Sequence, residues 1–143
     1  MTSFNDVIDL ALVTVDDYKL VKLMQQSEEE FLEYCDGFLI RAIPNFFQCR
    51  QSLDYDLNNR VFESDLTPVE ISILADFWAI EWLTKEVQNS AQFQLKLKVN
   101  NAFTFNSEAQ NLKEKTSWLD RLRERVWQKI VDYQVSDLSD FAY

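Results

Sequence analysis

The sequence predicts a mainly α-helical fold, a bundle of about four helices with a long C-terminal helix and a short β-ribbon between the last two helices. Only one of the 143 residues is a glycine, Gly37, where average usage of roughly 7% would give about ten, so tight turns are scarce. Two capping boxes precede the two longest stretches of helical periodicity. We expect a single helical domain over 1–134, with 1–15 as a possible extended arm, and a flexible C-terminal tail over 135–143.

The N-terminal residues hold an ambiguous apolar run and a short amphipathic segment. The run Val7–Val13 is interrupted by Asp9, and its pattern fits either a short strand or an extended arm. Thr14 and Asp16 are residue types that start helices. Apolar residues then follow in a short amphipathic pattern at Tyr18, Leu20, Val21, Leu23 and Met24. We therefore expect a short helix in this segment.

A clearer helix begins after Ser27. Ser27 is a good N-cap, and the acidic residues 28–30 lie in the first turn, where they favour the helix dipole. Pro44 ends the pattern. Gly37 costs about 1 kcal/mol relative to alanine in mid-helix, which suggests a close helix crossing there. The apolar repeat consists of Phe31, Cys35, Phe38 and Ala42.

The segment 45–66 is typical of an irregular connector, with a turn expected at Asn58–Asn59. It ends at the strongest local signal in the chain. Thr67 can cap a helix, Pro68 suits the first helical position, and Glu70 can reach back to the Thr67 amide. The sequence therefore predicts a helix from Pro68 to about Asn89.

Apolar side chains occur almost all round that helix, so it must be covered on more than one face. The cover can come from the other helices or from neighbouring subunits, and the all-round pattern favours the second. One side carries Ile71, Trp78 and Trp82, and another carries Val69, Ile73, Ile80 and Val87.

The period then changes from helical to alternating. Phe93, Leu95, Leu97 and Val99 alternate with polar residues, as in a strand. After a plausible turn at Asn100–Asn101, residues Ala102 to Phe105 can pair back as a second strand. A lone two-stranded ribbon is marginal in water, so we expect it to pack on a helix or to pair with another chain.

A second capping box, Ser107 with Gln110, predicts a final helix that runs to about Gln134. Its main apolar stripe consists of Leu112, Leu119, Leu122, Val126, Ile130 and Tyr133. Trp127 and Val131 lie about 90–120° from that stripe and form a separate flank. This flank is either a second core contact within the monomer or a subunit contact.

The composition excludes several classes of site. The chain has no histidine, which removes Ser/His and Cys/His nucleophile pairs and the helical histidine pair of zinc proteases. A single glycine leaves no glycine-rich phosphate loop. Cys35 and Cys49 lack zinc-ligand spacing and are interpreted as reduced thiols of an intracellular protein. We expect no enzyme activity, metal, cofactor, signal peptide or membrane span.

The net charge of −10 is concentrated in the N-terminal half. Residues 1–70 hold 14 acids and 5 bases, which gives −9 of the total. This balance is opposite to the basic footprint of a general duplex-DNA binder, and it is typical of a solvated surface. The basic cluster Arg121, Arg123 and Arg125 is interleaved with Asp120 and Glu124, which favours a salt-bridged helix surface over a phosphate site.

The order of signals from Asp65 onward is distinctive: an Asp-Leu-Thr-Pro-x-Glu helix start, a tryptophan-rich helix ending near Trp82-Leu83, a short Leu/Lys/Phe ribbon, Ser107 with Asn111-Leu112, and a long helix ending at Tyr133. This order resembles tailed-bacteriophage head-to-tail connector proteins, also called head completion or neck adaptor proteins. The resemblance covers about half of the chain and does not reach the acidic N-terminal half.

The resemblance implies a helical virion protein of the phage neck that assembles as a homo-oligomeric ring, commonly a dodecamer. Its implied partners are the portal protein, the next neck or tail protein, and DNA in transient, non-specific contact. An acidic channel would let DNA pass without sticking. The candidate subunit or partner contacts lie on the flank, the ribbon and the tail: Trp127, Val131, Leu97, Val99, Phe103, Phe105, Phe141 and Tyr143.

Two other classes of function remain open. A small acidic helical protein can be a phage-encoded inhibitor of a host enzyme, either as a DNA mimic or as an anti-defence protein. Against this alternative, the acids form no regular ladder and the chain has an excess of apolar residues. The third class is an enzyme, for which the sequence offers no nucleophile, base or metal set.

Overall fold

The computed structural model describes residues 1–15, 18–97 and 102–139, and these residues are mainly α-helical, as predicted. The five helices are α1 (Phe4–Val15), α2 (Tyr18–Gln26), α3 (Glu28–Ala42), α4 (Pro68–Leu97) and α5 (Ala102–Ser139). A short 3₁₀ helix, η1 (Ile43–Asn45), follows α3, and three two-residue strands are β1 (Thr2–Ser3), β2 (Tyr55–Asp56) and β3 (Val61–Phe62).

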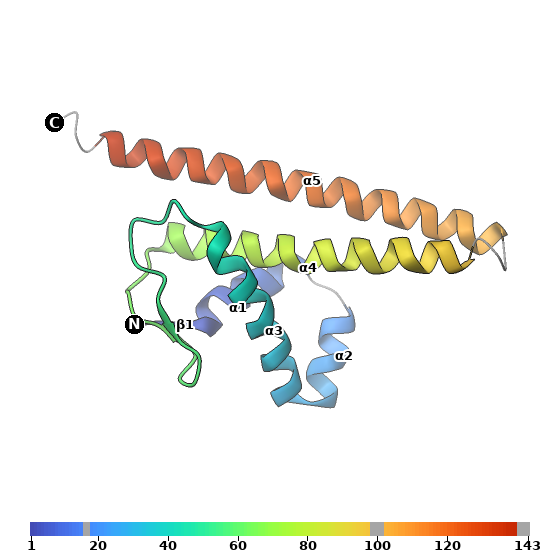
Figure 1. The fold of residues 1–143 in the computed structure, drawn as a ribbon, viewed down its shortest axis with the longest axis horizontal. Helices are drawn as coiled ribbons and strands as arrows, with labels where there is room; N and C mark the ends of the chain where they lie inside the picture. The colour runs from blue at the N-terminus through green and yellow to red at the C-terminus, as the bar shows by residue number, and fades with distance from the viewer. Residues whose placement is uncertain (16–17, 98–101, 140–143) are drawn as a thin grey trace.

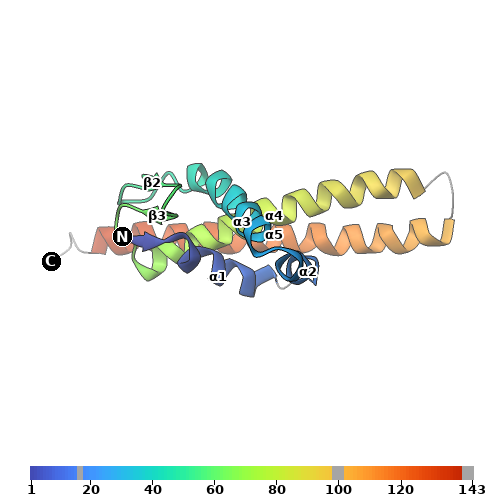
Figure 2. The same cartoon turned by 90° about the horizontal axis from the view of Figure 1, so that it is seen from below.

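Helices α4 and α5 form a long antiparallel hairpin on which the rest of the molecule is built. Figure 1 shows α5 along one side of α4, and α1, α2 and α3 on the other side. Seen at 90° in Figure 2, α1 and α3 diverge to opposite flanks of the hairpin. The half of the hairpin nearest the α4–α5 connection projects beyond the three smaller helices. This projecting half is only two helices thick.

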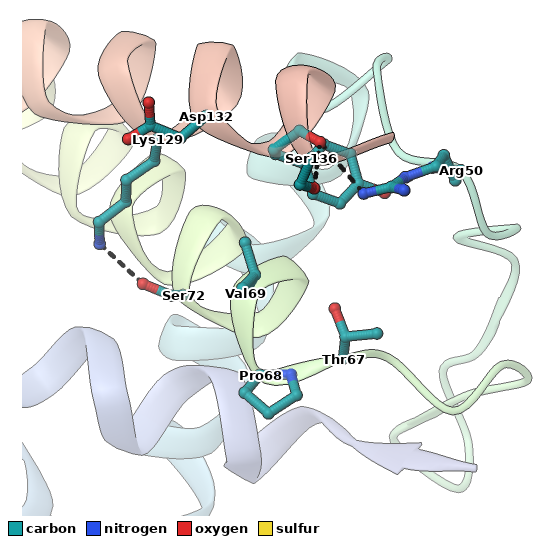
Figure 3. Close-up of a pocket in the computed structure, with 9 residues that line it drawn as sticks. Arg50, Thr67, Pro68, Val69, Ser72, Lys129, Asp132 and Ser136 are labelled. Atoms are coloured by element: carbon teal, nitrogen blue, oxygen red, sulfur yellow. Dashed lines mark hydrogen bonds between the residues drawn. The ribbon is translucent and has the colours of Figure 1, made fainter. Parts of the chain in front are cut away.

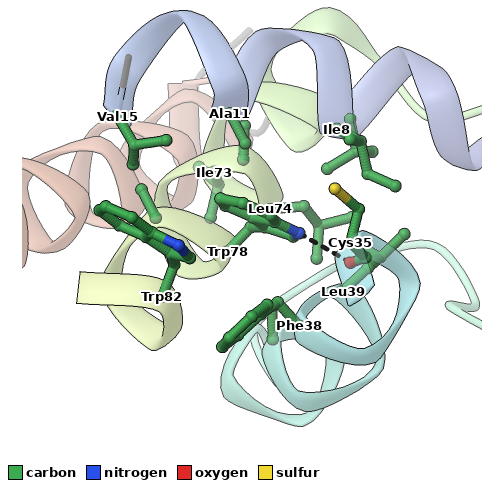
Figure 4. Packing of buried hydrophobic residues seen from close by; sticks show 14 of the residues in the cluster. Ile8, Ala11, Val15, Cys35, Phe38, Leu39, Ile73, Leu74, Trp78 and Trp82 are labelled. Atoms are coloured by element: carbon green, nitrogen blue, oxygen red, sulfur yellow. Dashed lines mark hydrogen bonds between the residues drawn. The ribbon is translucent and has the colours of Figure 1, made fainter. Parts of the chain in front are cut away.

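The hydrophobic core surrounds the first half of α4, and the chain itself covers it. Figure 4 shows Trp78 and Trp82 of α4 among side chains from α1 and α3. The Trp78 Nε1–H donates a hydrogen bond to the Cys35 carbonyl at 2.9 Å. The opposite side of α4 packs on α5, through a stripe of α5 that the sequence correctly predicted to be apolar. Most of the cover that the apolar pattern of α4 requires therefore comes from α1, α3 and α5 of the same chain, whereas Val69 and Leu95 remain exposed.

The N-terminus is a helix in place of the expected strand or extended arm. After the two residues of β1, α1 begins at Phe4. Its buried residues recur every three or four positions and face α4: Phe4, Val7, Ile8, Ala11 and Val15. Asp9 lies on the solvent side of this helix, so it does not interrupt the apolar face.

The start and end of α3 match the sequence prediction, whereas the interpretation of its glycine does not. Ser27 is the N-cap, and its hydroxyl accepts a hydrogen bond from the Glu30 N–H at 3.3 Å. The helix ends at Ala42, two residues before Pro44. Apart from the neighbouring backbone of α3 itself, no atom of the described residues lies within 4 Å of the position that a Cβ on Gly37 would occupy. Gly37 therefore lies at an exposed position of α3, and no other helix of the described chain crosses α3 there.

The connector before α4 contributes β2 and β3 to a small antiparallel sheet, in which β3 also pairs with the N-terminal β1 in the order β1-β3-β2. The turn between β2 and β3 lies at Asn58–Asn59, as expected, and the Asp56 carboxylate accepts both backbone N–H groups. Arg60 has a positive φ of 56°, and its guanidinium binds the buried Asp36 carboxylate of α3 through two bonds of 2.8 Å. This ion pair attaches the turn between β2 and β3 to α3.

The predicted β-ribbon between the last two helices was wrong. α4 continues to Leu97 and α5 begins at Ala102, so both proposed strands are helical where the structure describes them. The alternation from Phe93 is short, and its polar positions are glutamine and lysine, which favour helices. A ribbon of two strands also lacks a third strand to stabilise it. Val99 lies outside the described residues.

The last helix is longer than predicted at both ends. Ser107, expected to be its N-cap, lies inside α5, which begins five residues earlier at Ala102. The helix continues beyond Gln134 to Ser139.

Candidate functional site

The first turn of α4 meets the C-terminal part of α5 at a buried carboxylate, Glu70, which is 2% exposed. The capping box predicted from the sequence places it there. Thr67 Oγ1 accepts the Glu70 N–H at 3.3 Å, and Glu70 Oε1 accepts the Thr67 N–H at 2.8 Å. This reciprocal contact turns the glutamate side chain back over the helix start and into the protein.

Three further side chains donate to the same carboxylate. Gln51 Nε2 lies 2.6 Å from Oε1, the Tyr133 hydroxyl lies 2.8 Å from Oε2, and Cys49 Sγ lies 3.3 Å from Oε2. Burial acts to raise the pKa of Glu70, but the hydrogen bonds from Thr67 and these side chains hold it below its ordinary value. Glu70 is therefore an ionised acceptor that joins the connector, α4 and α5.

Tyr133 and Arg50 complete this cluster at the end of α5. The Arg50 backbone N–H donates to the Tyr133 hydroxyl at 2.9 Å, and its Nη2 donates to the Tyr133 carbonyl at 3.2 Å. The guanidinium also lies over the Tyr133 ring, 4.1 Å from its centroid. Burial raises the pKa of the Tyr133 hydroxyl. The sequence predicted Tyr133 as part of the apolar stripe of the last helix. It did not predict the contact of Tyr133 with Arg50, which is distant in the sequence.

A cavity of about 620 Å³ opens beside this cluster, between the first turn of α4 and the last turns of α5. Figure 3 shows side chains of both helices on its walls and Arg50 at one end. The Lys129 ammonium lies 2.8 Å from Asp76 Oδ2 and donates a hydrogen bond to Ser72 Oγ at 2.7 Å. The lining residues are Arg50, Thr67, Pro68, Val69, Ser72, Lys129, Asp132, Tyr133 and Ser136.

Buried acids of α4 pair with bases of α5 along the hairpin. Asp76 is 2% exposed and receives Arg125 Nη2 at 2.6 Å in addition to Lys129. Farther along, the Lys115 ammonium lies 3.8 Å from the buried Glu86 carboxylate and donates to Ser90 Oγ at 3.0 Å. The sequence indicates that these acids are unusual, because they interrupt an otherwise apolar helix. It does not indicate which bases they contact, because those bases are distant in the chain.

The basic cluster of α5 is only partly the salt-bridged surface that the sequence predicted. Arg123 and Asp120 form an exposed pair at 3.7 Å, as expected. Arg125 instead reaches across the interface to the buried Asp76. The cluster therefore divides between a surface contact and a contact that holds the two helices together.

The geometry supports a structural role for the Glu70 cluster. Both cysteines are free thiols, in line with the sequence expectation. Burial raises the pKa of Cys49 to about 11, so its sulfur remains protonated at neutral pH and is a poor nucleophile. Among the described residues, no group of three or more cysteine, aspartate or glutamate side chains is arranged to hold a metal ion.

The candidate interface residues fall in separate places. Trp127 is 63% exposed and Val131 is partly buried, and Val135, which is 54% exposed, continues their line at four-residue spacing along α5. We call Trp127, Val131 and Val135 the α5 stripe. The structure rules out a core position for Trp127. The stripe also faces away from the cavity, because Trp127 is two residues, or about 200°, from Lys129 around the helix.

The other candidates lie at the ends of the hairpin. Leu97 is the last residue of α4, and Phe103 and Phe105 lie in the first turns of α5, at the end of the hairpin farthest from the α5 stripe. Phe141 and Tyr143 lie outside the described residues, as does Val99. The structure therefore brings Trp127 and Val131 together and separates both from the hairpin tip.

No helix within the described ranges combines the length and apolar character required to cross a membrane. Comparison with protein families, curated proteins and solved structures found no match to this chain.

Proposed function

We propose that this chain is a structural subunit of a tailed-phage neck, which forms a ring adaptor between portal and tail through which DNA passes. It acts by assembly with copies of itself, with the portal protein and with the next neck or tail protein. The proposal joins the sequence resemblance from Asp65 onward to one structural observation, the α5 stripe, of which the described part of the chain leaves Trp127 and Val135 exposed.

The α5 stripe supports assembly because large apolar side chains in line are unusual on a surface that faces only water. Trp127 is 63% exposed and Val135 is 54% exposed, and they lie eight residues apart on one side of the same helix. Tryptophan is among the residue types that dominate the binding energy of protein interfaces. A neighbouring subunit seated on this stripe would remove the apolar surface from water.

Contacts between α4 and α5 hold the helix that carries the α5 stripe in a fixed position. Another side of α5 is fixed to α4 by the apolar core residues of α5 and by the contacts of Asp76 with Arg125 and Lys129. A surface on a rigid helix loses little conformational entropy when it binds a partner. Most apolar residues of α4 do not add to this proposal, since they pack within the chain, although Val69 and Leu95 are exposed.

The decisive measurement is the mass and shape of the purified protein in solution, alone and with a portal protein, by native mass spectrometry and negative-stain microscopy. Rings, or rings that form when the portal is added, support the adaptor function. A strict monomer under both conditions contradicts it. If that monomer binds a host nuclease tightly, the acidic inhibitor becomes the better proposal.

A pair of variants tests whether the α5 stripe is the subunit contact. Trp127→Ala should abolish ring formation while the helical circular dichroism signal is retained, because the side chain has no core contact to lose. Arg121→Ala is the matched control, since Arg121 is an exposed residue on another side of the same helix. Equal loss of helicity and assembly in Trp127→Ala would contradict the surface role.

A further inference from the structure

The flank of the molecule that carries α3 has a pocket of about 230 Å³ where α3 meets α4. This volume is several times the roughly 30 Å³ that a water molecule occupies in the liquid, so the pocket has room for a side chain. We call it the Gly37 pocket. Its lining residues are Glu33, Tyr34, Gly37, Phe38, Arg41 and Lys85.

The conformation and packing of the described chain do not require a glycine at position 37. Gly37 lies in the middle of α3 without a positive φ, and glycine is less favourable than alanine there. Apart from the backbone of α3 itself, no described atom lies within 4 Å of the position of an added Cβ. A glycine at such an uncovered place lets the backbone of a second molecule approach closely.

The two cations of the Gly37 pocket, Arg41 and Lys85, form no ion pair within the described part of the chain. The Lys85 ammonium lies 5.3 Å from the centroid of the Tyr34 ring and 5.6 Å from that of Phe38, and such ring contacts leave its charge uncompensated. Arg41 is exposed in the last turn of α3. The pocket therefore offers free positive charge in a chain whose net charge is −10.

The opposite flank of the molecule presents a helix face with a complementary pattern. Figure 2 shows α1 and α3 on opposite flanks of the hairpin. The exposed side of α1 carries Asp6 in its first turn, followed by Leu10 and Val13, which are 42% and 78% exposed. Their spacing of four and three residues puts them on one side of the helix. We call Asp6, Leu10 and Val13 the α1 ridge.

We propose that the Gly37 pocket binds the α1 ridge of a second copy of this chain. The inference rests on the proposed ring assembly, because a closed ring of identical subunits repeats a head-to-tail contact between two different surfaces of each copy. The Gly37 pocket and the α1 ridge lie on opposite flanks, as such a contact needs. This contact is additional to the one assigned to the α5 stripe.

Charge sets the direction in which α1 of one copy crosses α3 of the next. Asp6 and Val13 are about 10.5 Å apart along α1, and Glu33 and Arg41 are about 12 Å apart along α3, at 1.5 Å per residue. When the helices run antiparallel, Asp6 lies beside Arg41 and the apolar end of the ridge lies beside Glu33. The parallel direction would place Asp6 against Glu33, and like charges brought together disfavour a contact.

Disulfide cross-linking between two variants tests the contact directly. Leu10→Cys and Gly37→Cys are prepared separately, because the antiparallel arrangement places these positions opposite each other. The two proteins are mixed, and oxidised glutathione serves as the oxidant that converts the two thiols to a disulfide. Mass spectrometry should show the mixed dimer in several-fold excess over the two like dimers.

Two features of the chain keep this measurement specific. Burial above all raises the pKa of Cys35 to about 12 and that of Cys49 to about 11, so the native thiols react slowly. Val135→Cys, at a position on α5 that is 54% exposed, replaces Leu10→Cys in the control mixture and should give no excess of mixed dimer. An equal excess in the control would overturn the proposal.

Gly37→Leu tests the pocket without a reactive group. The added side chain fills the space that the α1 ridge would occupy, so ring formation should be lost. The helical circular dichroism signal and the urea midpoint should be retained, because the described chain does not crowd this position. Gln88→Leu is the matched control, since Gln88 is an exposed residue of α4 that does not line the pocket, and it should leave ring formation unchanged.

A reversal of charge tests the pairing of Asp6 with Arg41. Asp6→Arg and Arg41→Asp should each weaken ring formation, because each places like charges together at the contact. Both substitutions in the same chain should restore it, since opposite charges then meet again. Loss in both single variants without recovery in the double variant would contradict this pairing, because a purely structural defect is not rescued in this way.

The outcome for this contact can be separated from the outcome for the ring adaptor. Wild-type rings without an excess of the mixed dimer between Leu10→Cys and Gly37→Cys would overturn the contact and leave the adaptor function intact. If the wild type forms no rings, the adaptor function fails, and cross-linking at high protein concentration still decides the contact, because the disulfide traps a pair of copies without closure of a ring.

Discussion

Asp76 and Arg125 are joined across the α4–α5 interface, with Nη2 of the arginine 2.6 Å from Oδ1 of a carboxylate that is almost fully buried. Lys129, one turn farther along α5, approaches the other oxygen of the same carboxylate at 2.8 Å. With Glu70 and Tyr133 at one end and Glu86 and Lys115 toward the other, polar pairs recur along the antiparallel hairpin. These pairs define one register of α4 against α5, because a shift of one helix by one turn would leave the buried acids without partners.

Substitution of Asp76 by alanine should destabilise the protein by about 2 kcal/mol, because it removes the common acceptor of two cations and leaves a gap in the interface. The cost stays below that of a fully buried pair, since the partner bases are partly exposed. Urea unfolding followed by circular dichroism measures the difference. Asp120→Ala, which breaks the exposed pair with Arg123, should cost less than about 0.5 kcal/mol. Equal costs would contradict the assigned role of Asp76.

Gly37→Ala should stabilise the protein by about 0.5–1 kcal/mol. Gly37 lies in the middle of α3 with a negative φ, and outside the backbone of α3 no atom that the structure describes lies within 4 Å of the position of the added Cβ. Alanine therefore gains helix propensity without a steric cost. The increase should be seen as a higher midpoint in urea unfolding with an unchanged slope. A loss of stability would indicate a close packing partner for this helix face.

Signals contained within a few residues were sufficient to predict where α3 and α4 start. Ser27 caps α3, and Thr67 pairs with Glu70, because each motif is completed within one turn of helix. The apolar stripe of α5 was predictable for a related reason, since its spacing reflects the helical period alone. The ambiguous run in α1 had the correct spacing too, but Asp9 obscured it.

Features that depend on distant parts of the chain were not predictable. The alternation that begins at Phe93 fits a strand, whereas α4 continues as a helix to Leu97. The Glu70 cluster joins Gln51, Glu70 and Tyr133, which become neighbours only after the connector and α5 have folded onto α4. The cover of α4 by α1, α3 and α5 is a tertiary property of the same kind.

Glu70→Gln should cost about 2 kcal/mol at neutral pH, because the ionised acceptor of several hydrogen bonds is replaced by an amide that cannot accept them all. The folded-state pKa of Glu70 lies below its ordinary value. Its charge therefore contributes fully to stability above the unfolded-state pKa of about 4.3, and the contribution is lost as pH falls through the folded-state pKa.

The free energies of unfolding of wild type and Glu70→Gln should accordingly converge as pH is lowered below about 4.3. Urea titrations at a series of pH values measure this convergence. Glu63→Gln is the control, since Glu63 is an exposed residue beside β3 and its substitution should change little at any pH. A difference between wild type and Glu70→Gln that stays constant through the acid range would mean that the charge of Glu70 is not the stabilising feature.

The two native thiols should be almost unreactive toward alkylation in the folded protein near neutral pH. Burial, together with the Glu70 carboxylate that accepts the Cys49 S–H, raises the pKa of Cys49 to about 11, and burial raises that of Cys35 to about 12. Relative to a free cysteine with a pKa near 8.5, the thiolate population of Cys49 falls by roughly two orders of magnitude. Alkylation followed by mass spectrometry measures both sites, with Cys49→Ser isolating the signal of Cys35. In denaturant both thiols should react at ordinary rates, whereas fast alkylation of Cys49 in the folded state would show that the contact with Glu70 is not maintained in solution.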